Sequence, residues 1–251
     1  MSTVQTRVTF FRSGDDFDQK AAEKIIRLLK ESMSGRRKFS IALSGGETPR
    51  GVYRQLASIS PKHHVDWSRV HLFFSDERAV PAKDPQSNFG MIDRELISQI
   101  KIPKENIHRI KGELDPQKAA TEYQKDLRAT LRGKGNRLDL VLLGLGADGH
   151  TASLFPGAVD VGKRGALVAP VEVNGTHGSR VTLTLRCINN ARTIVFLVTG
   201  SKKSSIVQRV LHAKNPTKDL PASFVSPNDG SLLWVLDEEA GASLASDGDA
   251  G

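Results

Sequence analysis

Short apolar segments alternate with stretches of helical periodicity along most of this chain. Apolar residues at helical spacing predict a helix over residues 15–33, with Asp15 or Asp16 as its cap. Strands that alternate with helices favour an α/β fold, in which a mainly parallel sheet carries helices on both faces. The strands expected in this sheet cover residues 7–12, 39–43, 70–74, 107–110, 138–143, 193–198 and 232–236.

The remaining stretches predict further helices and one antiparallel pair. Asp115 followed by Pro116 indicates a helix start, and that helix should end near residue 131. Two strands separated by a short polar loop, over residues 166–173 and 180–185, are typical of an antiparallel pair. The other expected helices follow Pro49 and cover residues 91–100 and 201–212. We expect residues 1–240 to form a single domain and residues 241–251, which are small and polar, to be a disordered tail.

The charge of the chain is basic but not clustered. Lys and Arg total 36 against 28 Asp and Glu, which gives a formal net charge of +8. A nucleic-acid binder would concentrate this charge, whereas the longest basic run here is Arg36-Arg37-Lys38, so no nucleic-acid partner is expected. A positive field that steers a small anionic substrate explains the sign equally well, as does a basic surface without a partner.

The same composition bears on the compartment. No apolar run approaches the ~20 residues that a membrane span needs, and the first residues lack the apolar core of a signal peptide. Cys187 is the single cysteine, so no internal disulfide can form. These features predict a cytoplasmic protein with no membrane partner.

Three loops with unusual residues each follow an apolar strand, and in a parallel sheet such loops meet at one edge. The first contains Ser44, Gly45 and Gly46, with Thr48 expected as the N-cap of a helix and Pro49 at its first position. A helix start with exposed amides and small hydroxyl groups is an anion site. An ordinary capped turn between strand and helix is the alternative.

The second loop, Ser75-Asp76-Glu77-Arg78, directly follows the strand at residues 70–74. Such a charged cluster is usually solvated. At a strand end, however, Arg78 could bind a phosphate or carboxylate through its planar guanidinium, or stabilise an oxyanion.

The third loop, residues 144–150, has glycines in the GxGxxG pattern of dinucleotide-binding folds. That pattern requires a long helix after the third glycine, and Pro156 arrives too soon for one. Glu172 lies at a tolerable distance for a ribose-binding acid, so the cofactor interpretation stays open but is not favoured. His150 leaves this turn beside Asp148, which makes His150 a candidate base.

Other catalytic patterns are missing from the sequence. No GxSxG elbow surrounds Ser44, and there is no HExxH or paired-cysteine metal motif. A serine hydrolase or a zinc enzyme is therefore not indicated.

Taken together, the loop sequences resemble the glucosamine-6-phosphate isomerase/6-phosphogluconolactonase family, and the lactonase branch within it. The similar segments are residues 42–57, 70–91, 138–157, 180–192, 198–203 and 221–225. The resemblance implies a modified Rossmann-like (NagB/RpiA-like) sheet and hydrolysis of a sugar-phosphate lactone in the oxidative pentose phosphate pathway. It implies neither a metal nor an organic cofactor.

The resemblance also implies roles for individual residues. His150 would be the general base, and Asp148 would orient it or merely form the turn. Ser44, Gly45, Gly46, Thr48, Asp76 and Gly149 would line the substrate site, and Arg78, Arg180 and Lys203 would supply its positive charge. Lys203 rather than Lys202 fits the family spacing. A monomer or weak homo-oligomer is expected.

Two alternatives remain at this point. A deaminase of the same family shares the glycine loop and the Asp-Gly-His sequence, but Thr151 to Pro156 look like the lactonase pattern instead. A sugar-phosphate-binding protein without catalytic activity would use the same loops.

Overall fold

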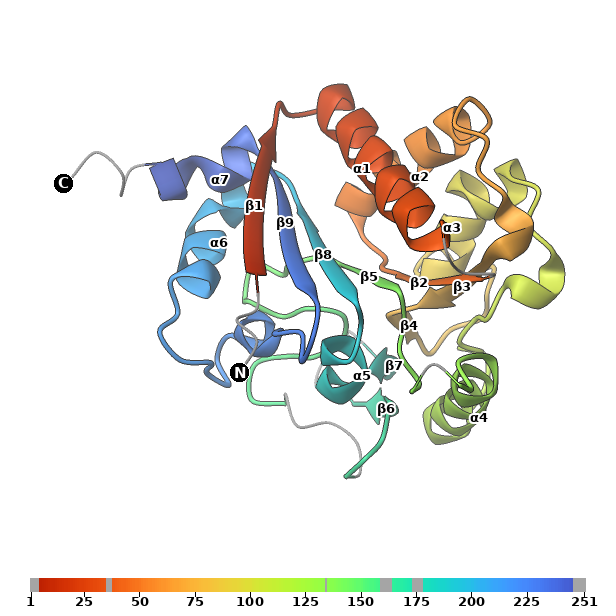
Figure 1. The fold of residues 1–251 in the computed structure, drawn as a ribbon. Helices are drawn as coiled ribbons and strands as arrows, with labels where there is room; N and C mark the ends of the chain where they lie inside the picture. The colour runs from red at the N-terminus through yellow and green to blue at the C-terminus, as the bar shows by residue number, and fades with distance from the viewer. Residues whose placement is uncertain (1–4, 35–37, 134, 159–163, 173–177, 246–251) are drawn as a thin grey trace.

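A six-stranded parallel sheet forms the centre of the protein (Figure 1). A computed structural model describes residues 5–34, 38–133, 135–158, 164–172 and 178–245. The strand order is β1-β9-β8-β5-β2-β3. The strand bounds are β1 Gln5–Phe11, β2 Phe39–Leu43, β3 Val70–Phe74, β5 Leu140–Leu143, β8 Thr193–Val198 and β9 Ser231–Asp237.

Helices cover both faces of this sheet, as the alternating pattern predicted. The β1-to-β2 and β8-to-β9 connections cross the sheet in opposite directions, so right-handed crossovers place α1 and α6 on opposite faces (Figure 1). Strands β2, β3 and β5 are buried along their whole length, which explains why they are mainly apolar. The helices are α1 Asp15–Met33, α2 Glu47–Ile59, α3 Asn88–Glu95, α4 Pro116–Thr130, α5 Leu185–Asn189, α6 Ser204–Leu211 and α7 Glu238–Ala245.

A second, three-stranded antiparallel sheet lies beside the first. Its order is β4-β7-β6, with bounds Asp76–Arg78, Arg180–Leu183 and Val168–Val171. The antiparallel pair expected from the sequence is confirmed as β6 and β7. The polar segment after β3, predicted as a loop, instead forms β4 and pairs with β7.

Two sequence predictions about chain segments are wrong. The strand expected at residues 107–110 is reduced to a single bridge between Ile107 and Leu72, and the only further ladder contact there is the hydrogen bond from the His108 amide to the Leu72 carbonyl among the described residues. The tail was expected to be disordered from residue 241, but it is helical to Ala245. Gly241, in this helix, packs directly against the Phe10 ring. The rest of that predicted tail, residues 246–251, lies outside the described part of the chain.

Asp139, the one charged residue in the apolar run before the glycine turn, has a structural role. It is buried, and one carboxylate oxygen accepts hydrogen bonds from the Ser40 amide at 3.0 Å and the Ser40 hydroxyl at 2.9 Å. Arg192 contacts the other oxygen at 3.4 Å. Asp139 therefore ties the start of β5 to the neighbouring strand β2.

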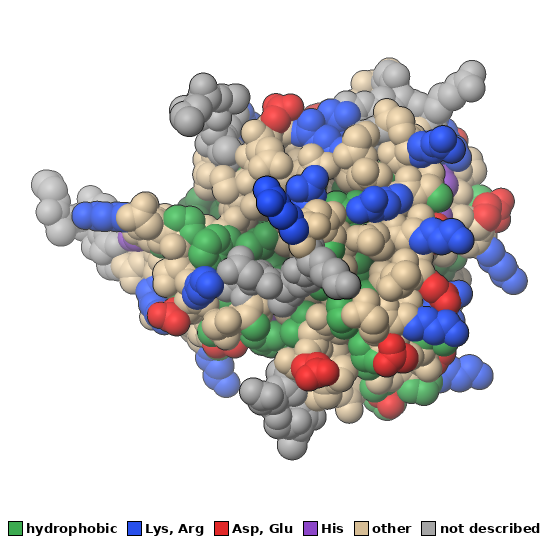
Figure 2. Space-filling view, turned by 90° about the horizontal axis from the view of Figure 1, so that it is seen from below, with side chains coloured by type: hydrophobic (Ala, Val, Ile, Leu, Met, Phe, Trp, Pro, Cys, Tyr) green, Lys and Arg blue, Asp and Glu red, His purple; other side chains and the backbone are tan. Residues whose placement is uncertain are grey.

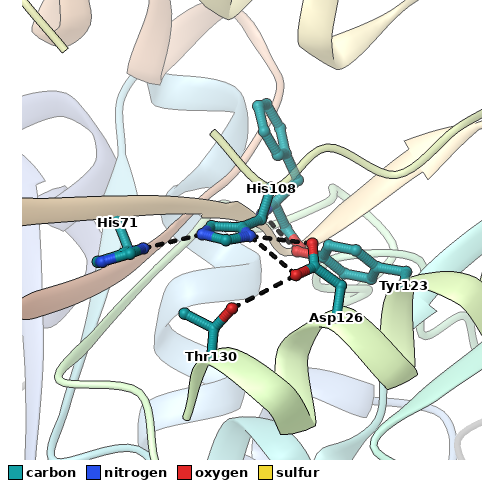
Figure 3. A network of polar contacts seen from close by, with 6 residues as sticks. His71, His108, Tyr123, Asp126 and Thr130 are labelled. Atoms are coloured by element: carbon teal, nitrogen blue, oxygen red, sulfur yellow. Dashed lines mark hydrogen bonds and ion pairs between the residues drawn. The ribbon is translucent and has the colours of Figure 1, made fainter. Parts of the chain in front are cut away.

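The outer edge of β3 is covered by a polar network that the sequence did not indicate (Figure 3). His71 of β3 shares a 2.9 Å hydrogen bond with His108, whose other ring nitrogen lies 2.9 Å from Asp126 on α4. Thr130 donates to the same carboxylate, and the Tyr123 hydroxyl bonds both the amide and the carbonyl of Phe74. The Tyr123 contacts occupy the two backbone groups of Phe74, which an edge strand would otherwise expose.

The surface agrees with the even distribution of charge in the sequence. On the face drawn in Figure 2, the described Lys and Arg side chains are scattered, with Asp and Glu among them, and do not form one stripe. None of the helices in the described ranges is long and apolar enough to cross a membrane. Cys187 is buried in α5, and burial raises the pKa of its thiol to about 12.

Candidate active site

One cavity of about 970 Å³ opens where the polar loops meet. The loops after β2 and β5 contribute to it, together with β4, β7 and the start of the segment after β8. The convergence predicted from the strand-end loops is therefore observed. The predicted residues that line the cavity are Ser44, Gly45, Gly46, Thr48, Asp76, Arg78, Asp148, His150, Arg180 and Lys203.

Gly149 is the one predicted site residue that does not line this cavity. It is buried, and a Cβ at this position would lie 2.9 Å from the Leu220 side chain. Its φ of 86° and the hydrogen bond from the Ala222 amide to its carbonyl show its role in the turn. The structure thus places Gly149 behind the cavity wall, where it shapes the loop that carries His150.

Ser44 offers a hydroxyl to the cavity. The side chain is 3% exposed, and its Oγ has no hydrogen-bond partner among the described residues. The Tyr53 hydroxyl holds the Ser44 backbone by accepting from its amide at 3.0 Å and donating to its carbonyl at 2.8 Å. A buried, unpaired hydroxyl on a fixed backbone is suited to bind a polar ligand, because such a ligand would supply the missing partner.

The start of α2 differs from the prediction at Thr48. The N-cap is Gly46, with a φ of 111° that favours glycine, so Thr48 and Pro49 lie within the first turn. Thr48 does not cap the helix but shares a 2.7 Å hydrogen bond with Thr199 at the end of β8. Since no described side chain caps α2, its first amides remain available to an anion.

His150 and Asp148 form a close pair at the cavity. His150 Nδ1 lies 2.6 Å from Asp148 Oδ1, and the His150 amide donates to the same oxygen at 3.1 Å. Burial alone would raise the pKa of Asp148, but the hydrogen bonds and the charge of His150 outweigh it and lower that pKa. Asp148 therefore stays ionised and accepts a hydrogen bond from the Nδ1–H group, which leaves Nε2 as the basic nitrogen of His150.

The glycines of this turn serve the histidine. A Cβ at Gly146 would lie 2.0 Å from His150 Nδ1, so only glycine lets the imidazole pack here. Phe155 lies against the other side, with ring centroids 4.9 Å apart. In the described residues that follow, through Ala158, no helix forms. The long helix that a dinucleotide site needs is thus absent from this segment.

Positive charge faces the cavity from two sides. Arg78 and Arg180 lie opposite one another in the β4–β7 pair, and burial together with the charge of Arg78 lowers the pKa of Arg180. Lys203 lines the cavity whereas Lys202 does not; burial lowers the pKa of Lys203, although the charge of Asp148 raises it. Like charges directly opposite each other destabilise a strand pair, and an anionic ligand would relieve that repulsion.

Sequence reasoning missed Asn88 and Ser153, both of which line the cavity. Ser153 Oγ donates to Asp76 Oδ2 at 2.6 Å, and Asn88 donates to Asp76 as well. A weak signal did exist for Asn88, because Ser87 caps α3 and so marks Asn88 as the first residue of a helix near the site. Glu172, considered for a ribose, also reaches the cavity.

The described ranges contain no group of three or more His, Cys, Asp or Glu side chains placed to hold a metal ion. The site instead presents cationic groups, free amides and a histidine held by a carboxylate. Chemically, such an arrangement can bind a small anion and activate water beside it.

Fold and site together define an α/β protein whose cavity is suited to a small anion, with the uncapped start of a helix and a histidine–carboxylate pair in its lining. The family model described as glucosamine-6-phosphate isomerases/6-phosphogluconolactonase matches residues 12–234. The chain belongs to this family, which confirms the resemblance in the sequence.

Individual members of the family are similar to this chain in sequence and in fold. The chain is 36% identical over 239 residues to the 6-phosphogluconolactonase of Homo sapiens, which covers 93% of this chain and 92% of that protein. The crystal structure of 6-phosphogluconolactonase from Thermotoga maritima matches with a TM-score of 0.81 and 32% identity, covering 93% of this chain and all of that one. A monomeric glucosamine-6-phosphate deaminase shares the fold, with a TM-score of 0.80, 21% identity and coverage of 94% and 99%.

Proposed function

We propose that this protein hydrolyses 6-phosphoglucono-δ-lactone to 6-phosphogluconate, the second step of the oxidative pentose phosphate pathway. The observation that carries the proposal is the His150–Asp148 pair, 2.6 Å apart, at a cavity lined by Arg78, Arg180 and Lys203. Lactone hydrolysis requires a base for water and positive charge for the developing oxyanion and the phosphate. The lactonases among the relatives support the same reaction.

His150 is the general base in this mechanism. Asp148 accepts a hydrogen bond from Nδ1–H, so Nε2 is free to remove a proton from the water that attacks the lactone carbonyl carbon. The imidazolium formed in this step is stabilised by the carboxylate of Asp148. No covalent intermediate is needed, which agrees with the lack of a serine elbow in the sequence.

The tetrahedral intermediate carries its negative charge on the former carbonyl oxygen. Arg78 or the amides of the glycine loops would stabilise this oxyanion, and one well-placed donor is typically worth about 3–4 kcal/mol. When the intermediate collapses, the ring carbon–oxygen bond breaks and protonated His150 returns its proton to the leaving ring oxygen. His150 is then neutral again for the next water.

The phosphate group is held away from the reacting carbon. We assign it to the start of α2 with the Ser44 hydroxyl, and to Arg180 and Lys203. Binding energy from this remote group orients the lactone toward His150.

Replacement of His150 tests the proposal. His150→Ala should lower kcat by roughly 10²- to 10⁴-fold, because positioned general-base catalysis is typically worth that much. Turnover is measured with freshly prepared lactone by coupling 6-phosphogluconate formation to NADPH production. Calorimetry with 6-phosphogluconate should still detect binding, since the phosphate contacts remain.

His63→Ala is the matched control, because His63 lies beyond the opposite end of α2 from the cavity and should leave kcat unchanged. Near wild-type turnover by His150→Ala would refute the base assignment. Release of ammonia from glucosamine 6-phosphate by the wild-type protein would favour the deaminase instead, and ligand binding without any turnover would favour a non-catalytic sensor.

We propose a monomer or weak homo-oligomer in the cytoplasm; the single buried thiol of Cys187 suits a reducing compartment. Light scattering at increasing protein concentration tests the assembly state, and cell fractionation tests the compartment.

A further inference from the structure

Asn88, the first residue of α3, contacts strand β4 and the turn before α2, both of which contribute to the site. It is 3% exposed, yet it lines the cavity. We propose that Asn88 is a positioning residue, which holds Asp76 and the Ser44–Gly46 turn in register with the loop that carries His150. This inference rests on the proposed lactonase reaction and adds a residue to its machinery.

The first contact of Asn88 is with Asp76. Asn88 Nδ2 donates to the Asp76 carbonyl at 3.0 Å and to carboxylate oxygen Oδ1 at 3.3 Å. The other carboxylate oxygen, Oδ2, accepts from Ser153 Oγ at 2.6 Å. Ser153 is buried and lies only three residues after His150 in the chain. Asn88 thus reaches the histidine loop through one carboxylate.

The second contact of Asn88 is with Gly45. A Cβ at Gly45 would lie 1.9 Å from Asn88 Oδ1 and 2.3 Å from Asn88 Cγ. The carboxamide therefore occupies the space beside Gly45, in the turn that begins α2, where any side chain would lie. Any shift of this side chain changes the space in which the anion-binding turn sits, because interiors are packed without slack.

Asn88 is itself held firmly from behind. The backbone N–H of Asn88 donates to Glu77 Oε1 at 2.7 Å. Glu77 Oε2 accepts from the backbone N–H of Phe89 at 2.7 Å and from Ser87 Oγ at 3.1 Å. Glu77 is buried, so this carboxylate fixes the first turn of α3 from inside the protein. The Asn88 side chain consequently acts from a rigid base.

A carboxamide suits this position because it is neutral. It can donate to the Asp76 carboxylate without adding charge beside Arg78 and Arg180, whose positive charge the proposed reaction uses. An aspartate here would have almost the same shape but would place an acceptor where Nδ2 now donates.

Asn88→Asp tests the inference through pH. Its new oxygen would face Asp76 at hydrogen-bond distance, and two such carboxylates share a proton. The buried Glu77 would disfavour ionisation of this pair, whereas Arg78 and Arg180 would favour it. When the pair shares a proton, the hydrogen bond between residue 88 and Asp76 is kept. When both carboxylates are ionised, they repel each other, and the displaced Asp76 loses its hydrogen bond from Ser153.

We therefore expect the ratio of variant to wild-type kcat to be highest at low pH and to fall by about tenfold as the pH rises and the pair loses its proton. KM should change less than kcat. Asn106→Asp is the matched control: Asn106 is also buried and donates through Nδ2 to a backbone carbonyl, that of Ser68, but it does not line the cavity. Its kcat ratio should stay near one at every pH.

A second measurement covers the case in which Asn88→Asp does not fold. If Asn88 and Ser153 act through the same carboxylate, Asn88→Ala and Ser153→Ala should be non-additive: the double variant should lose little more kcat than the worse single variant. A pH-independent ratio for Asn88→Asp, or additive losses in this cycle, would overturn the inference. Absence of lactone hydrolysis by the wild-type protein would instead refute the proposed function.

Discussion

At the scale of single residues, the site brings together two side chains of the same positive charge. Arg78 and Arg180 lie opposite each other across two strands, and burial lowers the pKa of Arg180. Asp76 and Glu77 offset part of this repulsion, but each guanidinium leaves its Nε unpaired among the described residues. A dianionic phosphate would neutralise this charge, so the cationic residues should contribute to substrate binding before they contribute to chemistry.

Replacement of the cationic residues should therefore raise KM. Arg180→Ala and Lys203→Ala should each raise it by roughly ten- to a hundredfold, because a hydrogen bond to a charged group is worth about 1.5–3 kcal/mol. Steady-state kinetics of lactone hydrolysis measures the effect. Lys202→Ala is the control and should leave KM unchanged, since Lys202 does not line the cavity. A loss of kcat alone would mean that these cations act on the reacting carbonyl.

At the scale of elements, the two tyrosines of the chain do similar work at the ends of adjacent strands. Tyr53 on α2 bonds both backbone groups of Ser44 after β2, and Tyr123 on α4 bonds both backbone groups of Phe74 in β3. Burial raises the pKa of both phenols above its ordinary range, so both stay neutral and can donate. Only the Tyr53 contact, however, is made with a residue of the cavity.

This difference predicts distinct effects for the two hydroxyl groups. Tyr53→Phe and Tyr123→Phe should each lower the free energy of unfolding by about 1–3 kcal/mol, because buried backbone groups lose a partner. Tyr53→Phe should in addition raise KM, since the Ser44 backbone is no longer held, whereas Tyr123→Phe should leave KM unchanged. Urea unfolding and lactone kinetics on both variants make the comparison. Equal KM values would show that the Tyr53 hydroxyl does not position the loop.

At the scale of the whole molecule, stability is linked to pH through the network at the edge of β3. Burial by itself would raise the pKa of Asp126, but hydrogen bonding to His108 and the charge of His108 outweigh it, so that pKa is lowered. A carboxylate with a lowered pKa stabilises the folded state above its unfolded pKa. This contribution is lost as pH falls through the folded pKa.

Asp126→Asn should consequently be less stable than wild type at neutral pH, and the gap should close as pH falls below about 4. Urea unfolding across this range measures the free energies. Glu105→Gln, which removes an exposed carboxylate from the short 3-10 helix Lys104–Asn106 before His108, serves as the control and should follow the wild-type profile. A gap that stays constant with pH would mean that the variant acts by altered packing and not through its charge.

Much of the architecture could be predicted because its signals are local. Apolar runs and helical periodicity reflect burial of each segment, so β2, β3 and β8 were expected at their observed bounds, and so was the Asp115 cap of α4. The segment after β3 was misjudged. A strand of three charged residues has no periodicity, and its pairing with β7 involves residues about a hundred positions away.

The sequence alone thus determined the parallel sheet, the meeting of three loops and the choice of His150, because hydrophobic pattern and turn chemistry act within a few residues. Only the tertiary structure decided what surrounds that histidine. The Ser153 hydroxyl donates a hydrogen bond to Asp76, which lies 77 positions away in the chain. The Asn88 carboxamide, at the start of α3, packs against Gly45 in the turn before α2. Such contacts depend on how whole elements pack, and no local pattern encodes them. The relative positions of the side chains in the site therefore come from the fold, whereas the side chains themselves can be recognised in the sequence.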